Sequence, residues 1–420
     1  MRKLLQIGLM LLPLCSPAMA SDFNIPFANV AELGVVYADW ATYASDASTA
    51  YTNPAGLVKL PHQQFVFAGM GLLGGTKFTG TAITPSFRFP FPVVQSGVAK
   101  SRLDAFMPSV YYSIPISKRF TFGFAVTAPF ALGTHFKKDS LVRYLSTHSY
   151  VVGIDMGPNI GLKINDALSI GLGLDALRLA FTLSNMYGPP LSFPDADLHN
   201  HLVGWGYGWH GGILYDVAPG TRLGFSYNSM LVVRTTGAST VYPPVPDGEL
   251  RYNNQKTNAG LPARAQLSFQ HDFTPCWTGM ATIFYTNWRT FNQLTLKKTM
   301  TPFGTLTSVT IPFNYHNTFD YSLGTTFKIT DKWILRAGIQ FLNTPSNDRD
   351  RGVADPVGSA TIVGLGAHYQ YNTALGYDVG VGHAFFKQMP VNVTTPLTIL
   401  NGHTNTQSSV FGGQVTWNIV

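Results

Sequence analysis

Three histidines that lie close together are the first candidates for chemistry in this sequence. His199, His201 and His210 have a spacing that resembles a metal site, and imidazole nitrogen is a common zinc ligand. A structural zinc site takes four ligands, however, and these three residues straddle an expected loop and an expected strand with no fourth ligand beside them. We therefore predict no metal site and no other cofactor.

Nucleophilic chemistry has as little support. Cys276 has no His or Asp near it in the sequence that suggests activation, so we interpret it as a small apolar residue near a turn. No Ser or His stands with an ordered partner on one strand face, as a lipase or deacylase needs. The chain also has no phosphate-binding loop, and we expect the protein not to be an enzyme.

The first twenty residues have the features of a secretory leader. Two basic residues precede a short apolar run, and a small-residue site of the A-x-A type ends at Ala20. This pattern is typical of a cleaved signal peptide, so residues 1–20 are expected to be removed on export. Cys15 leaves with them, and the single remaining cysteine excludes an intramolecular disulfide.

The composition favours a membrane protein without membrane helices. Charged residues make up 12% of the chain and aromatic residues 13%, and there are 41 glycines. No stretch after the leader is apolar over the roughly 18 residues that a membrane helix requires, whereas a closed β-barrel satisfies every backbone group inside hydrocarbon. The formal charge of +7 is spread along the chain, so nucleic acid is not an expected partner.

Several segments alternate as barrel strands do, with apolar residues outward and small or polar residues inward. Within 319–329, Phe319 and Tyr321 share one face, whereas Asp320 and Ser322 share the other. A short polar turn follows, and the next segment alternates again. The chain is therefore predicted to be all-β, an antiparallel transmembrane β-barrel.

Alternation predicts about fourteen strands, an even number that closes an antiparallel barrel with both ends at the periplasmic side. The predicted segments lie near 63–75, 104–116, 119–137, 148–164, 168–185, 202–217, 221–239, 261–273, 277–296, 318–329, 333–344, 359–371, 374–388 and 408–420. Long connections rich in Pro, Asn and Gly are predicted at 76–103, 186–201, 240–260, 297–317, 345–358 and 389–407. Short turns alternate with these connections, which we expect to face the outside of the cell.

Residues 21–60 do not alternate like a strand, and they precede the first one. A barrel of about fourteen strands leaves an open lumen, so we expect this segment to fill it as a plug. The predicted organisation is a signal peptide at 1–20, an N-terminal hatch (plug) inside the lumen at 21–60, and a transmembrane β-barrel at 61–420.

The segment from Gly34 to Leu57, with Asn53-Pro54-Ala55 near its end, resembles the N-terminal hatch of the FadL family of long-chain fatty acid transporters. Further matches follow in the family's order, at Leu261-Pro262-Ala263, Thr286-Asn287-Trp288, Asp331-Lys332-Trp333 and Gly382-His383-Ala384-Phe385-Phe386. Together they cover nearly the whole mature chain. The resemblance implies a fourteen-stranded barrel with a hatch, in the outer membrane of a Gram-negative cell.

The resemblance also implies passive transport of long-chain fatty acids or similar hydrophobic molecules. They would be captured at the long loops, passed to a pocket beside the hatch, and released sideways at a kinked third strand. In this chain Pro129 removes a backbone donor, Gly133 permits a bulge, and the family's glycine at the opening corresponds to Ala131. We hypothesise a lateral opening at these three residues; the alternative is a proline where the strand leaves the membrane.

Ligand-contacting residues follow from the same resemblance. Arg178 lies near the family's basic residue on the fifth strand, so it is a candidate for holding a carboxylate; the alternative is an ordinary lumen charge. Asn53, Pro54 and Ala55 are predicted to form a turn at the lumen wall, which either anchors the hatch or gates the ligand. Loop residues predicted to form the capture groove, or to rest on lipid, are Met186, Tyr187, Leu191 and Phe193.

Other functions remain open. Relatives in the family admit toluene and other monoaromatic hydrocarbons, a general porin would need an unplugged and charge-lined lumen, and the loops could serve as a surface receptor. The Asp-Arg-Asp-Arg run at 348–351 is expected to be a solvated loop or a lipopolysaccharide contact. The expected partners are the hydrophobic ligand, outer-membrane lipid and lipopolysaccharide, and the protein is expected to be a monomer.

Overall fold

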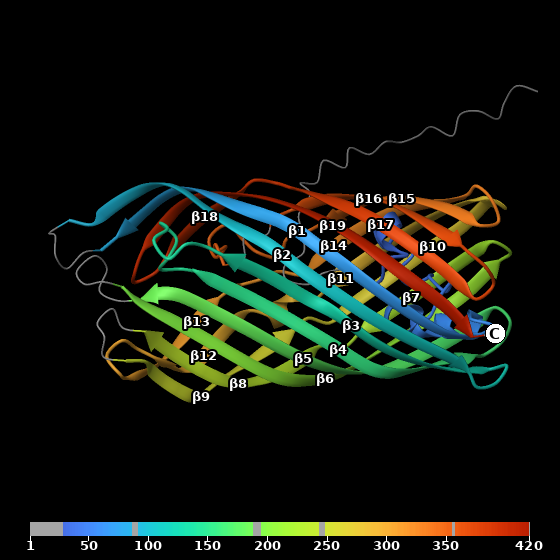
Figure 1. Cartoon of the computed structure of the whole chain (residues 1–420), viewed down its shortest axis with the longest axis horizontal. Coiled ribbons are helices and arrows are strands. Elements are labelled where there is room, and N and C mark those ends of the chain that lie inside the picture. The colour runs from blue at the N-terminus through green and yellow to red at the C-terminus, as the bar shows by residue number, and fades with distance from the viewer. Residues whose placement is uncertain (1–27, 86–90, 188–194, 243–247, 355–357, 420) are drawn as a thin grey trace, which may run out of the picture.

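The computed structural model describes residues 28–85, 91–187, 195–242, 248–354 and 358–419, which form one long barrel (Figure 1). The predicted signal peptide and the first residues of the predicted hatch lie outside the described residues, as do Leu191 and Phe193. Within the described ranges, no helix is long and apolar enough to cross a membrane.

Short helices near the start of the described chain are followed by strands. The helical elements are η1 (Leu33–Val35), α1 (Thr49–Thr52), η2 (Pro54–Lys59) and, much later, η3 (Trp288–Thr290). The strands are β1 (Gln63–Thr84), β2 (Val93–Pro115), β3 (Phe120–His135), β4 (His148–Lys163), β5 (Leu168–Tyr187), β6 (Ala196–Ala218), β7 (Thr221–Asn228), β8 (Leu231–Tyr242), β9 (Leu250–Leu261), β10 (Arg264–Thr274), β11 (Trp277–Thr286), β12 (Gln293–Met300), β13 (Leu306–Pro312), β14 (Thr318–Lys328), β15 (Trp333–Leu342), β16 (Ala360–Gln370), β17 (Leu375–Phe386), β18 (Met389–Thr394) and β19 (Ile399–Ile419).

One antiparallel sheet closes on itself, because β1 pairs with both β2 and β19. Some barrel strands are interrupted, so that one strand of the barrel consists of two successive β elements that pair with the same neighbouring strand. β6, for example, pairs with β7 over one part of its length and with β8 over the other. The pairs β9 and β10, β11 and β12, β13 and β14, and β17 and β18 are interrupted in the same way. Counted as whole strands, the described residues make a barrel of fourteen, so the predicted fold class is confirmed.

The strands are longer than alternation predicted. β1 has 22 residues and β2 has 23, and they occupy most of 76–103, which was expected to be a loop. Much of 240–260 and 389–407 is also strand. These outer parts carry polar residues such as Thr79 and Ser96, because they project beyond the hydrocarbon, where a polar outer face is favourable. Apolar alternation therefore marks only the lipid-facing part of each strand.

Residues 28–60, here called the N-terminal segment, lie inside the barrel at the end where the chain terminates (Figure 1). Short connections between strands lie at this end, which makes it the periplasmic one. The segment fits because glycines of the wall face it. A Cβ on Gly338 would lie 2.5 Å from the backbone of Val35, and one on Gly224 would lie 2.0 Å from the carbonyl oxygen of Ala41. Only a residue without a side chain permits so close an approach.

Candidate ligand path

An apolar cavity of about 140 Å³ lies inside the outer half of the barrel. An aromatic group forms part of its wall: the ring centroids of Phe291 and Phe313 are 4.9 Å apart, and those of Phe313 and Tyr315 are 5.2 Å apart. Most of the other lining side chains are aliphatic and come from β4, β5, β9, β12 and β13. The cavity therefore suits an apolar ligand.

One buried cation lines this cavity. The side chain of Arg351 is 1% exposed, whereas that of its neighbour Arg349 is 81% exposed. The guanidinium of Arg351 donates to Ser346 Oγ (3.1 Å), to Asp348 Oδ1 (2.7 Å) and to the carbonyl oxygen of Pro390 (3.1 Å). The run at 348–351 was expected to be a solvated loop or a lipopolysaccharide contact, and for Arg351 that expectation was wrong.

Asp350 also lines the cavity, and its carboxylate is bound by neighbouring side chains. Burial opposes its ionisation, yet side-chain hydrogen bonds with Asn347 and Asn314 outweigh this effect and lower the pKa of Asp350. Arg349 adds an ion pair of 3.4 Å. The carboxylate is therefore occupied by other donors, and Arg351 is the cationic group at the cavity wall.

The apolar lining continues from the cavity toward β3. Phe130 packs in the same buried cluster as the cavity residues Leu179 and Phe181. A Cβ on Gly153 would meet the ring of Phe130 at 3.1 Å and Leu177 at 3.2 Å, so Phe130 faces the lumen directly above that glycine. An apolar surface thus runs from the cavity to the third strand.

The barrel wall is incompletely paired where this surface ends. β2 and β3 pair at Val110 with Val126 and again at Arg102 with His135. Between these two points the described ladder contains no residue pair. On its other side, β3 bulges against β4, because Thr127 is opposite Asp155 whereas Phe130 is opposite Gly153. One extra residue in β3 thus reverses the direction of the side chains that follow.

The bulge contains Pro129, and the unpaired part of β3 contains Ala131 and Gly133. The structure therefore brings these three residues together at one interruption of the wall. On β2, Pro108 lies in the facing unpaired stretch, and it also lacks a backbone N–H. Pro108 was not singled out from the sequence, although a proline within a barrel strand is itself a signal of weakened pairing.

Asn53, Pro54 and Ala55 join the N-terminal segment to the wall. Asn53 caps η2 by accepting from the backbone N–H of Ala55 (3.1 Å), and Pro54 occupies the first position of that helix. Asn53 Nδ2 donates to the carbonyl oxygen of Ile213 on β6 (3.1 Å), and Ser169 on β5 donates to that of Ala55 (2.9 Å). These contacts anchor the segment at β5 and β6.

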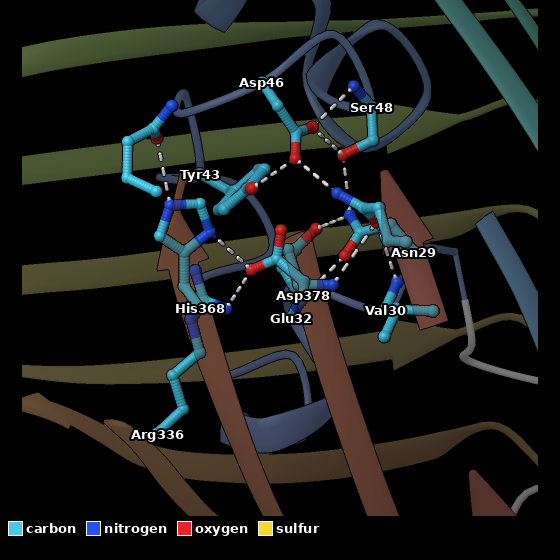
Figure 2. A network of polar contacts seen from close by, with 12 residues as sticks. Asn29, Val30, Glu32, Tyr43, Asp46, Ser48, Arg336, His368 and Asp378 are labelled. Carbon is cyan, nitrogen blue, oxygen red and sulfur yellow. Dashed lines mark hydrogen bonds and ion pairs between the residues drawn. The ribbon is translucent and has the colours of Figure 1, made fainter. Parts of the chain in front are cut away.

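A polar network fixes the other side of the N-terminal segment (Figure 2). Asp46 accepts from Tyr43 (2.7 Å), from Ser48 Oγ (2.6 Å) and from Gln414 of β19 (2.7 Å). Asp378 of β17 pairs with Arg336 of β15, and its Oδ1 lies 3.0 Å from His368 Nδ1. The segment and four wall strands, β15, β16, β17 and β19, therefore meet in one buried cluster of charges and amides.

Burial disfavours the ionised form of the carboxyl groups in the N-terminal segment. Burial raises the pKa of Asp39 to about 6 and raises that of Asp46. Burial, together with the nearby Asp39, raises the pKa of Glu32 well above its usual value. The docked N-terminal segment therefore favours protonated acids.

Arg178 does not reach the lumen. It is an exposed residue on the outer face of β5, opposite Ile154 of β4 and Trp205 of β6, which are exposed on the same face. β5 is regular across its register with β6, so Asp175 and Arg178 stay on opposite faces. The proposal that Arg178 holds a carboxylate in the lumen is corrected.

Met186 and Tyr187 lie at the outer end of β5. Met186 is buried, and its backbone N–H donates to Arg143 of the loop at 136–147 (2.9 Å). Tyr187 packs against the small cluster of Ala196, Leu198 and Val241. Neither residue lines the cavity, and Leu191 and Phe193 lie outside the described residues.

The three histidines first considered as ligands are separated. His210 is buried between Asp175 Oδ1 (2.6 Å) and the carbonyl oxygen of Ala50 (3.0 Å), where it ties α1 to the wall. His199 and His201 contact Ser184 and Thr182 on the outer face (2.9 Å each). No group of three metal-ligating residues gathers within the part of the chain that the structure describes.

Comparison with known proteins agrees with this architecture. Residues 11–418 match the family described as "Outer membrane protein transport protein (OMPP1/FadL/TodX)". The long-chain fatty acid transport protein of Escherichia coli K12 is 24% identical over 89% of this chain and 90% of its own length. Outer membrane protein P1 of Haemophilus influenzae is 24% identical over 91% and 89%.

Solved structures show the same fold. A FadL homologue of Pseudomonas aeruginosa superposes with a TM-score of 0.83 at 22% identity, over 94% of this chain and 99% of its own. The toluene transporter TbuX of Ralstonia pickettii superposes with a TM-score of 0.66 at 16% identity, over 95% and 99%.

Proposed function

The chain belongs to the OMPP1/FadL/TodX family of outer membrane transport proteins, and we propose that it carries long-chain fatty acids or similar hydrophobic molecules through a Gram-negative outer membrane. Proteins of this family are transporters and channels, so the chain is not an enzyme. Passive movement suffices for such a molecule, because burial of each CH₂ contributes about 0.8 kcal/mol that would be lost on a return to water.

The observation that carries this proposal is the continuous apolar surface from the cavity to the interrupted pairing of β2 and β3. A ligand that leaves the cavity past Phe130 would meet a wall without a full hydrogen-bond ladder. Release through that gap leads directly into lipid and avoids the periplasm. The residues of the lateral opening in this proposal are Pro129, Ala131 and Gly133.

The N-terminal segment closes the direct route through the lumen in this proposal. Asn53, Pro54 and Ala55 anchor it to β5 and β6, and the buried acid network holds it to β15, β16, β17 and β19. A general porin needs an open lumen, so its unobstructed ion conductance is not expected here. We further propose that the protein works as a monomer surrounded by lipid and lipopolysaccharide, since a single chain closes the barrel.

Arg351 favours a ligand that carries an anionic head. The guanidinium is buried at the wall of an apolar cavity, whereas its partner Asp348 is 66% exposed, so a carboxylate at the end of an acyl chain would share or replace that ion pair. The cavity holds only part of a long chain, and the apolar surface toward Phe130 offers the remaining length.

The size of the cavity favours a second candidate ligand. An apolar cavity of roughly 150 Å³ is enough to bind benzene, and this one is of similar volume and has aromatic residues in its wall. A monoaromatic hydrocarbon would use Phe291, Phe313 and Tyr315 and would have no need of Arg351.

Binding measurements on Arg351→Gln separate the two ligands. We expect the Kd for oleate to rise at least ~10-fold, because loss of a charged hydrogen bond costs about 1.5–3 kcal/mol, while toluene binding stays unchanged. Arg349→Gln, which alters an exposed neighbour, is the matched control. Equal oleate affinity in both variants and the wild type would contradict the carboxylate role and favour the hydrocarbon.

A further inference from the structure

Two histidines face each other across β3 and β4 at the point where both strands reach the outer loop. His135 is the last residue of β3, His148 is the first residue of β4, and the two are direct partners in the ladder. Their Nδ1 atoms are 3.3 Å apart, and the rings are inclined at 67° with centroids 5.4 Å apart. We call these residues the histidine pair.

The histidine pair lies on the outer side of the wall. The neighbouring Ser149 lines the apolar cavity, and alternation along the strand turns His148 the opposite way. His135 is exposed, and its partner is half-buried. β3 has 16 residues, so at a rise of about 3.3 Å per residue and a tilt of about 40° its outer end stands roughly 40 Å from its inner end. That height exceeds the apolar band of about 25 Å, so the pair is accessible from the outside.

We propose that the histidine pair is a zinc site. Zinc binds imidazole nitrogen at about 2.0–2.1 Å, and two such ligands at a tetrahedral angle stand roughly 3.3–3.4 Å from each other. The observed separation of 3.3 Å between the two Nδ1 atoms matches this span. The backbone ladder already fixes both strands, so little rearrangement is needed to bind the ion.

Without a metal ion the two rings share a long hydrogen bond, with one Nδ1 atom protonated. N–H donors in proteins usually lie 2.7–3.2 Å from their acceptors, and the observed distance lies beyond that range. Zinc accepts a lone pair from each Nδ1 atom when both rings carry their proton on Nε2.

The proposed site is an open one with two protein ligands. Among the described residues no third His, Cys, Asp or Glu joins the pair. Ser184 is the ladder partner of His148 on β5, but its hydroxyl contacts His199. Water or an external anion would complete the coordination, so the ion is expected to exchange with the medium and not to be a permanent structural part.

The histidine pair holds the base of the loop at 136–147. Within that loop Phe136 and Val142 are buried in the cluster at the outer end of the lumen. The backbone N–H of Phe136 donates to the carbonyl oxygen of Thr147 (2.8 Å), directly above the pair. On the inner side, Thr134 donates to the carbonyl oxygen of Ala354, which lines the cavity (3.3 Å).

Zinc bound to both histidines would therefore fix the base of a loop that covers the outer end of the lumen. We expect a bound ion to restrict movement of the loop and so to slow admission of ligand. This consequence rests on the proposed transport function, whereas zinc binding itself does not.

Calorimetric titration of the purified, detergent-solubilised barrel with zinc chloride tests the site. The wild type is expected to bind one zinc ion, and the Kd is expected to rise at least ~10-fold in His135→Asn and in His148→Gln. Loss of a residue that only hydrogen-bonds a metal ligand already lowers metal affinity by roughly 10–100-fold, so loss of a ligand should cost at least as much. His201→Asn is the matched control, because this residue lies on the same outer face and contacts only Thr182 among the hydrogen bonds described. No zinc binding by the wild type, or equal binding by all variants, would overturn the proposal.

Uptake of labelled oleate tests the consequence. Zinc is expected to lower the rate severalfold in cells with the wild type and to have no effect with His148→Gln. Uptake that is independent of zinc in both would remove the link to the loop. Absence of uptake in either condition, with zinc binding intact, would count against the transport function and leave the metal site standing.

Discussion

Individual glycines of the wall decide how closely the N-terminal segment docks. Gly338 on β15 and Gly364 on β16 contact this segment through backbone atoms, with a new Cβ placed 2.5 Å from Val35 and 2.6 Å from the carbonyl oxygen of Leu33. Other glycines, such as Gly413 on β19, have nothing within 4 Å of that position. Similar glycines in similar strands therefore carry different constraints.

Gly338→Ala is expected to loosen the N-terminal segment while leaving the barrel intact. The added methyl group overlaps backbone that cannot rotate away, and overpacking of this kind typically costs about 1–3 kcal/mol. Ion conductance of the protein in planar bilayers should rise from near zero to intermittent openings.

Gly413→Ala is the control and should stay closed, because its new methyl group meets nothing. Equal conductance in the two variants would show that the segment does not depend on this contact.

Sequence reasoning at this scale reaches only as far as local chemistry determines the conformation. Asn53 and Pro54 were predicted to form a turn at the lumen wall, and in the structure Asn53 caps η2 and Pro54 begins it. Arg178 was misplaced because a single-residue change in register reverses a side chain between lumen and lipid. Arg351 was missed because its burial depends on the fold of the whole loop and on Pro390, about forty positions later.

Among the elements, β3 differs most from a regular barrel strand. It loses its ladder to β2 between Val110 and Arg102, and it bulges against β4 at Ala128 and Pro129. In the unpaired stretch, β2 carries Pro108 and β3 carries Pro129, and a proline has no backbone N–H to donate to a neighbouring strand. The interruption is thus encoded in both strands.

Replacing Pro129 and Gly133 with alanine should lower fatty acid uptake without loss of the folded barrel. Alanine restores a backbone donor at 129 and reduces the freedom at 133, so both changes favour continued pairing. Uptake of labelled oleate would be measured in cells lacking their own transporter. The heat-dependent shift in gel mobility of the protein would show whether the barrel is folded. Pro158→Ala on β4, within a fully paired part of the ladder to β3, is the control. Unchanged uptake in the double variant would contradict a lateral route.

At this scale the sequence determined the number of strands but not their ends. Apolar alternation identifies the portion of each strand that meets lipid, and fourteen such portions were found. The outer extensions of β1 and β2 bury Phe78, Ala82 and Ala99 on one face, but the other face mixes valines with polar residues, so apolar alternation is weak there. Their pairing is visible only in the structure.

For the molecule as a whole, the contact between the barrel and its N-terminal segment depends on proton binding. Glu32, Asp39 and Asp46 of the segment are buried. Asp39 interacts electrostatically with Arg336 of the wall, and Asp46 with Asp378, which is bound to Arg336 and His368 (Figure 2). A carboxyl whose pKa is raised on docking binds a proton more tightly in the docked state. Docking is therefore strongest below the ordinary pKa, and this contribution is lost as the pH rises through the raised value.

The segment should accordingly be released more often at pH 8 than at pH 5. For Asp39 alone, a pKa shifted from 3.8 to about 6 weakens docking by on the order of 3 kcal/mol between a pH below 3.8 and a pH above 6, and about half of this falls between pH 5 and pH 8. Hydrogen exchange of residues 28–60, corrected for the intrinsic pH dependence, should show protection falling over this interval.

Asp39→Asn should flatten that dependence, because the amide has no proton to release. The barrel strands serve as the internal reference. Protection that increases toward pH 8, or that changes equally in the strands and the segment, would contradict this assignment.

The height of the barrel has a consequence for the kinetics of transport. β2 alone has 23 residues, which at about 3.3 Å each and a tilt of about 40° rise roughly 58 Å, more than twice the apolar band of about 25 Å. A cargo molecule leaves water far above the bilayer plane and then passes through the apolar cavity, whose volume of about 140 Å³ admits one molecule at a time. Flux should consequently follow single-file behaviour: it saturates when the cavity is occupied, and a slow-moving analogue delays every molecule queued behind it.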